Sequence, residues 1–227
     1  SLVINEIMFA PTAGDPEWLE VFNPTPSPLD AFRWTVSNRN TGSRYPLSTT
    51  AADVPAGGYV VVMKDTVGFR AGHPEASALL QSPSLPTFLF NNNGDAAVLF
   101  DPIGSLVDSI RYAPPKGLRA GTSLERIEPL GSSTDTANWG PSGDPEQCTP
   151  GRQNYLTPLE RDLRAVRLSA TGGFALLLVR NVGRQRVEAF GVEFSLDANG
   201  DSLPQATELI GTERVANPLS PGDTVLV

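Results

Sequence analysis

Apolar and polar side chains alternate along much of this chain, and the alternation predicts short β-strands. In residues 2–9 and 17–22 the side chains follow a period of about two residues, which is the period of a strand with one buried face. Such regularly spaced short strands are typical of a β-sandwich. Further strands are expected at residues 34–37, 59–63, 97–100, 106–112 and 123–128.

Glycine, proline and asparagine mark the turns between these strands. The 227 residues include 21 glycines and 21 prolines, and this richness in turn-forming residues favours short strands over long helices. The Asn-Asn-Asn-Gly-Asp sequence at residues 91–95 predicts a hairpin turn, because asparagine and glycine accept positive φ angles. Residues 65–71 are expected to form one helical turn, and residues 131–154 a loop anchored by Trp139.

The composition changes near residue 157, where a second all-β unit is predicted to begin. Residues 157–162 have the character of a linker, and the two domains are therefore expected to span residues 1–157 and 158–227. A complete sandwich of this kind usually needs about 100 residues, so we expect the second domain to be short or truncated. Its strands are predicted at residues 165–169, 174–181, 190–196, 207–215 and 224–227.

Charge and residue usage exclude several classes of function. The 17 basic residues are outnumbered by 25 acidic ones, which argues against binding to nucleic acid or to an anionic membrane. No apolar stretch approaches the ~20 residues of a membrane span. The chain has one histidine (His73) and one cysteine (Cys148). One cysteine cannot form an internal disulfide, and one histidine excludes most His-based catalytic sites and most zinc sites. We therefore expect no enzyme active site in the chain.

Two glutamates stand at positions where alternation predicts an apolar face. Glu6 is expected on the same face as Ile4 and Met8, and Glu20 lies in the second strand among large apolar residues. A buried carboxylate must find a partner or become protonated, and Arg126 is the expected complement. The pair could serve as the catalytic carboxylates of a glycosidase or belong to a structural charge network of Glu6, Glu20 and Arg126. The lack of any cleft signature favours the structural network, with at least one glutamate buried and bonded to arginine or a backbone N–H.

One acidic sequence in the second unit has the oxygen spacing of a calcium-binding loop. Asp197, Asn199, Asp201 and Glu208 occupy positions 1, 3, 5 and 12, as the ligands of an EF-hand do. However, Ser202 stands where that loop needs glycine, a proline follows, and the flanking segments are predicted strands. An ordinary β-turn therefore fits better, with Ca²⁺ as the alternative and no other cofactor expected.

The three tryptophans also allow two interpretations. Trp18, Trp34 and Trp139 could stack on sugar rings at an exposed sheet face, or they could be packing residues of the sandwich. All three lie in stretches that also carry the family resemblance described next, and that resemblance favours a packing role.

Five motifs of the first unit follow one another in a characteristic order. They are Val-Ile-Asn-Glu-Ile at 3–7, Glu-Trp-Leu-Glu-Val-Phe-Asn at 17–23, Pro-Ala-Gly-Gly-Tyr at 55–59, Ser-Leu-Glu-Arg-Ile at 123–127 and Thr-Pro-Gly at 149–151. Taken together, they resemble the bacterial version of the lamin tail domain over about residues 1–154. The resemblance implies an immunoglobulin-like β-sandwich without catalytic activity, of the kind appended to secreted or surface proteins.

In the second unit, an apolar strand predicted at residues 174–181 runs into an Asn-Val-Gly turn, and a second apolar strand follows at 190–196. This pattern resembles a CARDB-type domain, an immunoglobulin-like adhesion module. The two resemblances together imply two immunoglobulin-like β-sandwich domains in a non-catalytic binding, adhesion or spacer module of a secreted or cell-surface bacterial protein. The expected partner is a protein or a cell-surface glycan. The alternatives are a carbohydrate- or Ca²⁺-dependent binding module, or an accessory domain of a larger secreted hydrolase.

Overall fold

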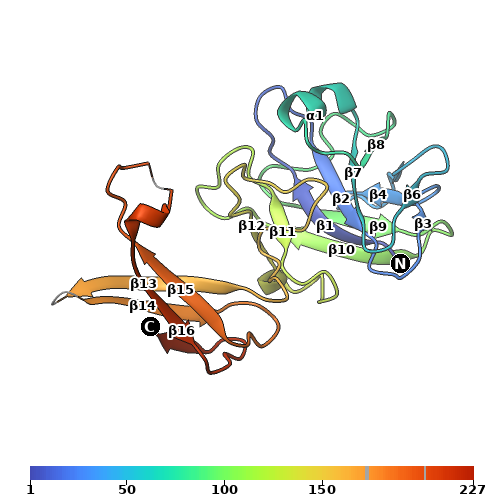
Figure 1. Cartoon of the computed structure of the whole chain (residues 1–227). Coiled ribbons are helices and arrows are strands. Elements are labelled where there is room, and N and C mark those ends of the chain that lie inside the picture. Colours follow the sequence, from blue (N-terminus) through green and yellow to red (C-terminus); the bar gives the residue numbers. More distant parts are fainter. Residues whose placement is uncertain (172–173, 202) are drawn as a thin grey trace. The chain divides into compact units, whose positions relative to one another are not determined.

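The computed structural model describes residues 1–171, 174–201 and 203–227, and its strands group into two compact units (Figure 1). The units are Ser1–Thr157 and Pro158–Val227. Strands dominate both units, and α1 (Thr66–Gly72) is the one α-helix of the described part of the chain. The predicted all-β class is therefore confirmed. No helix among the described residues has the length and apolar character needed to cross a lipid bilayer.

The first unit is a sandwich of two sheets. The larger sheet has the order β12-β11-β1-β2-β7-β8, and all its pairs are antiparallel except β7 with β8. Its strands are β1 (Val3–Met8), β2 (Trp18–Phe22), β7 (Tyr59–Met63), β8 (Leu79–Gln81), β11 (Leu124–Arg126) and β12 (Trp139–Pro141). The smaller sheet has the order β10-β9-β4-β5. Its strands are β4 (Thr35–Ser37), β5 (Tyr45–Pro46), β9 (Asp95–Phe100) and β10 (Leu106–Tyr112), and a separate short pair joins β3 (Leu29–Asp30) to β6 (Asp53–Val54).

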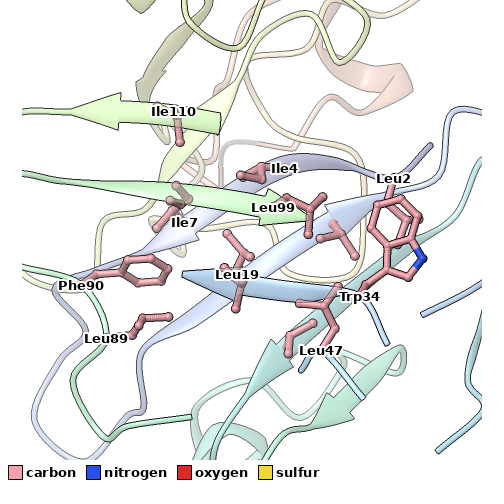
Figure 2. Packing of buried hydrophobic residues seen from close by; sticks show 14 of the residues in the cluster. Leu2, Ile4, Ile7, Leu19, Trp34, Leu47, Leu89, Phe90, Leu99 and Ile110 are labelled. Atoms are coloured by element: carbon pink, nitrogen blue, oxygen red, sulfur yellow. The ribbon is translucent and has the colours of Figure 1, made fainter. Parts of the chain in front are cut away.

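The main core fills the space between these two sheets. Leu19 of the larger sheet and Leu99 of the smaller one belong to the same buried cluster, with Trp34 and Leu47 at its edge (Figure 2). A second, smaller cluster covers the outer face of the larger sheet, where α1 packs through the fully buried Phe69. The larger sheet is therefore buried on both faces over part of its area.

A β-bulge in β1 changes which side chains share a face. The pairing of β1 with β2 shifts register between Ile4 and Glu6, so an extra residue is inserted at this point. As a result Ile4 and Ile7 both point into the main core, while Glu6 and Met8 lie on the outer face. The prediction that Glu6 shares a face with Ile4 is wrong, because simple alternation does not continue through a bulge.

Each predicted strand of the first unit coincides with a strand of the structure, but one predicted connection differs. Residues 91–95 do form a turn, with Gly94 at φ +117° and its N–H donating to Asn91 O. The turn closes no hairpin, because β9 pairs with β10 and β4 and not with the strand that precedes the turn. The predicted loop 131–154 contains η1 (Thr136–Asn138) and the edge strand β12.

The second unit has much less apolar burial. A three-stranded sheet has the order β13-β14-β17, and β15 and β16 form a separate hairpin. The bounds are β13 (Leu163–Thr171), β14 (Phe174–Asn181), β15 (Phe190–Ser195), η2 (Ala206–Glu208), β16 (Leu209–Val215) and β17 (Thr224–Leu226). Of the apolar side chains described in this unit, Val179 and Leu219 are buried. Asn181 is also buried, and its amide donates to Leu219 O and Gln185 O at 2.8 Å.

The first unit is expected to need residues 115–157 for folding, because β11 is an inner strand beside β1. A fragment of residues 1–157 should unfold cooperatively on heating, whereas residues 1–114 alone should lack a cooperative transition. Circular dichroism in the near and far ultraviolet measures both. A cooperative transition with native-like aromatic signals in the 1–114 fragment would contradict this expectation.

Candidate functional site

Three buried glutamates come together on the outer face of the larger sheet. Glu6 of β1 lies directly opposite Glu20 of β2 and Glu125 of β11 in the strand register. All three side chains are fully buried. We call these residues the carboxylate cluster. Glu125 was not predicted as a member, because the neighbouring position of β11 beside β1 cannot be read from local alternation.

The carboxylate cluster holds an irregular segment, residues 147–157, which we call the strap. Glu6 accepts a hydrogen bond from the Thr149 N–H at 2.8 Å, Glu20 accepts one from Gly151 N–H at 2.6 Å, and Glu125 accepts one from Leu156 N–H at 2.9 Å. A buried segment without regular structure needs partners for its backbone N–H groups. The three carboxylates supply these partners and bind the strap to the sheet.

Two asparagines complete this network. The Asn5 amide donates to Glu20 at 2.8 Å and to the side-chain oxygen of Asn154 at 2.7 Å. The Asn154 amide in turn donates to the backbone oxygens of Asn5 and Arg126 at 3.0 and 2.8 Å. Asn154 thereby connects the end of the strap to two neighbouring strands.

The Thr149 hydroxyl lies between two carboxylates of the cluster. Its oxygen is 3.0 Å from Glu6 Oε2 and 2.9 Å from Glu125 Oε1. A hydroxyl carries one hydrogen, so these two carboxylate oxygens compete for a single donor. Burial raises the pKa of Glu6 to about 7, and the charge of Glu125 adds to this effect. The pKa of Glu20 is raised well above its ordinary range by burial and by the charge of Glu6.

Arg126 does not join the carboxylate cluster, and the expected pairing with Glu6 or Glu20 is wrong. Alternation along β11 turns Glu125 toward the cluster and Arg126 to the opposite face. There the guanidinium donates to Asp108 of β10 at 2.8 Å and to Ile4 O at 2.9 Å. Both members of this ion pair are nearly inaccessible, with side chains 4% and 6% exposed. The pair therefore links the two sheets across the interior of the sandwich.

The carboxylate cluster has the geometry of a brace and not of a catalytic pair. Each of its six carboxylate oxygens has a hydrogen-bond partner within the chain. None of the three side chains is exposed, so a substrate has no route to them. A glycosidase needs its two carboxyl groups on either side of an accessible glycosidic bond.

The fold also brings the lone cysteine and the lone histidine together. The Cys148 sulfur lies 3.9 Å from His73 Nδ1, although 75 residues separate them in the chain. Burial, with the charges of Glu6 and Glu146, raises the pKa of the Cys148 thiol to about 12. Burial also lowers the pKa of His73. The sulfur is thus a buried thiol at neutral pH and not a thiolate nucleophile.

The tryptophans are packing residues. Trp18 and Trp34 are 2% and 6% exposed and belong to the two buried clusters. Trp139 is partly buried, its indole N–H donates to Ser133 O at 3.0 Å, and the Arg126 guanidinium lies 5.7 Å from its ring centroid. Trp18 and Trp34 therefore offer no indole face to a sugar ring, and Trp139 packs against the main core.

The first unit has an open groove at the end of the sandwich near α1. Its volume is about 750 Å³, and loops 11–17 and 83–88 form much of its wall. Phe88 on this wall is 79% exposed. At the base of the wall, Glu17 accepts hydrogen bonds from the Leu89 and Phe90 N–H groups at 2.7 and 3.0 Å, and burial raises its pKa to about 7. The groove therefore has a wall held by hydrogen bonds to Glu17 and an exposed aromatic side chain, Phe88.

In the second unit, the structure brings three of the four predicted calcium ligands together. Asp197, Asp201 and Glu208 each place a carboxylate oxygen within 4.8 Å of the others, and we call them the acidic cluster. Asn199 contacts Asp201, accepting from its N–H at 2.9 Å and donating to its carboxylate at 3.1 Å. Strands β15 and β16 flank this segment as predicted. Ser202 lies outside the described residues.

Comparison with known proteins gives one family match. A sequence model described as "LTD: Lamin Tail Domain" matches residues 1–114. No curated protein matches the chain. Among solved structures, the crystal structure of Amycolatopsis orientalis exo-chitosanase CsxA aligns with 16% sequence identity and a TM-score of 0.24. That alignment covers 97% of this chain, which spans 22% of the length of the chitosanase chain.

The stability of the first unit is expected to fall as pH rises from about 4.5 to about 7. Folding raises the pKa of Glu6 and of Glu17 from 4.5 to about 7, so the folded state holds protons that the unfolded state releases. Glu6→Gln should reduce this dependence and stabilise the unit by about 1–3 kcal/mol at pH 8, since the amide donates to Thr149 without being charged.

Urea unfolding followed by tryptophan fluorescence at pH 5 and pH 8 measures this effect. The exposed Glu75→Gln serves as the matched control and should leave the curve unchanged. A Glu6→Gln protein that is less stable than the parent at pH 8 would show that the charged carboxylate is needed.

Removal of Arg126 should strongly destabilise the sandwich. Arg126→Met leaves Asp108 charged, buried and without its cation, which typically costs about 3–5 kcal/mol. The double variant Arg126→Met/Asp108→Asn should recover part of that loss, because the stranded charge is gone. The same unfolding assay tests both variants, and an effect of Arg126→Met below about 1 kcal/mol would refute the inter-sheet role.

Proposed function

Because the sequence model of the lamin tail domain matches half of this chain, the chain belongs to that family, and we propose for it a non-catalytic binding, adhesion or spacer role. Domains of this family are immunoglobulin-like and generally without enzymatic activity. We place the role in a secreted or cell-surface bacterial protein, with a CARDB-like adhesion domain formed by residues 158–227. The partner is a protein or a cell-surface glycan.

The complete hydrogen bonding of the carboxylate cluster is the observation that carries this proposal. Glu6 and Glu20 are the acidic residues whose placement resembled a catalytic pair, and their oxygens are occupied by Asn5, Ser123 and the strap. The single cysteine, Cys148, is a buried thiol. The reactive side chains are therefore used for internal support, and contacts with other molecules are left to the loops.

The groove beside α1 is the surface best suited to a partner. Loops on a rigid β-scaffold are frequent binding elements, and exposed aromatic side chains often contribute much of the binding energy. Phe88 provides such a side chain, and Pro11, Pro16 and Pro83 line the same groove. The prolines restrict the loop conformations, which lowers the entropy lost on binding.

Binding of the fluorescently labelled chain to intact cells of its source organism tests the proposal. We expect saturable binding to the cell surface and no hydrolysis of cell-surface glycans by the chain. Phe88→Ser should weaken the binding about tenfold or more, as expected for an aromatic anchor. Ile103→Ser is the matched control, since Ile103 is 88% exposed on a different turn, and it should bind like the parent.

Two results would count against this function. Absence of saturable binding up to about 100 μM would remove the binding role, because weaker contacts fall below the range of specific recognition. Native chain located only inside intact cells, protected from added protease, would remove the secreted or surface location.

A further inference from the structure

We propose that the acidic cluster of the second unit is a Ca²⁺ site, with Asp197, Asp201 and Glu208 as its protein ligands. The site lies in the connection between β15 and β16, separate from the carboxylate cluster and the groove of the first unit. The inference is independent of the proposed binding role, because it concerns a different ligand and different residues.

The first supporting observation is the convergence of three carboxylates. Their oxygens lie within 4.8 Å of one another, although the residues are spread over 12 positions of the sequence. Like charges at this distance repel one another, and a divalent cation among them converts the repulsion into attraction. Asp197 and Asp201 are exposed, which leaves room for water molecules to complete the six to eight ligands that Ca²⁺ usually takes.

The second observation is an unpartnered oxygen on the buried member of the cluster. Glu208 is 7% exposed, and its Oε1 accepts a hydrogen bond from Ala198 N–H at 3.1 Å. Its Oε2 is buried and has no hydrogen-bond partner among the residues that the structure describes. A buried carboxylate oxygen without a partner is costly, and a cation at the cluster would satisfy it.

Backbone hydrogen bonds hold Glu208 in this position. Its N–H donates to Gln205 O at 2.9 Å, and its own carbonyl accepts from Leu196 N–H at 2.8 Å. On the opposite side of the cluster, Asp197 accepts from Gly200 N–H at 2.6 Å. The two ends of the acidic cluster are therefore fixed before a ligand arrives, so binding costs less conformational entropy.

Hydrogen bonds to Asp201 are compatible with metal binding. Its Oδ1 accepts from Leu203 N–H at 2.8 Å, and its Oδ2 accepts from the side-chain amides of Asn199 and Gln205 at 3.1 and 2.7 Å. A carboxylate offers about four lone-pair positions, so its oxygens can coordinate a cation while still accepting hydrogen bonds. The amide donors are neutral and leave the negative charge of Asp201 available to a cation.

The ligand chemistry selects calcium among the common metals. The acidic cluster supplies carboxylate oxygens only, while zinc sites usually include histidine or cysteine. Mg²⁺ demands a near-ideal octahedron at short distances, whereas Ca²⁺ accepts irregular geometry and longer bonds. A connection between two strands with one buried and two exposed carboxylates suits the more tolerant ion.

Calcium titration of the full chain, followed by calorimetry and by ¹H–¹⁵N NMR, tests the site. We expect a dissociation constant of about 0.1–1 mM, as for other extracellular calcium modules. The amide shifts should be confined to the residues around the acidic cluster, Ala198 and Gly200 among them. Glu208→Gln should weaken binding about tenfold or more, because it removes the buried charge while keeping the shape.

Two further variants keep the test decisive. Asp201→Asn changes an exposed ligand, so the variant should fold even if Glu208→Gln does not, and it should also weaken binding about tenfold. Glu213→Gln on the adjacent β16 removes an exposed charge outside the cluster and should leave the affinity unchanged. The proposal would be overturned if about 10 mM Ca²⁺ produced neither binding heat nor amide chemical-shift changes. It would also be overturned if Glu208→Gln and Asp201→Asn bound Ca²⁺ with the affinity of the parent chain.

Discussion

The first unit depends on the hydrogen bonds between three buried carboxylates and the backbone of the strap. Part of the outer face of the larger sheet is covered by the strap, an irregular segment whose backbone does not pair with a strand. Glu6, Glu20 and Glu125 accept hydrogen bonds from three N–H groups of this segment. The raised pKa of Glu6 follows from burying three acids in one site.

The inner face of the same sheet uses a second polar device. The Arg126–Asp108 pair crosses the core from one sheet to the other, and Ile4 contributes its backbone N–H and carbonyl to the two partners. The bulge in β1 makes both arrangements compatible, because it directs Ile4 inward and Glu6 outward within three residues. Such buried hydrogen-bonded networks favour one well-defined packing, and they leave the loops as the variable part of the domain.

The carboxylate cluster and the acidic cluster differ in how completely their carboxylate oxygens are satisfied. In the carboxylate cluster all the glutamate oxygens have partners within the chain, so nothing is left for a ligand. In the acidic cluster of the second unit, one buried oxygen of Glu208 has no partner among the described residues. The contrast explains why a similar group of three acids is interpreted as a brace in one unit and as a cation site in the other.

The sequence alone determined the longer strands, most of the turns and the absence of common catalytic motifs, because these depend on period-2 alternation and on the local preferences of glycine, asparagine and proline. The short strands β3, β5, β6, β8 and β12 were not predicted. It also indicated Asp197, Asp201 and Glu208 through their spacing. Tertiary structure decided which faces and neighbours these residues have. The bulge moved Glu6 to the outer face, β11 brought Glu125 beside it, and β10 gave Arg126 its partner Asp108. These outcomes depend on strand order and register, which are set by pairing between strands that lie from about fifteen to more than one hundred positions apart and leave no local signal.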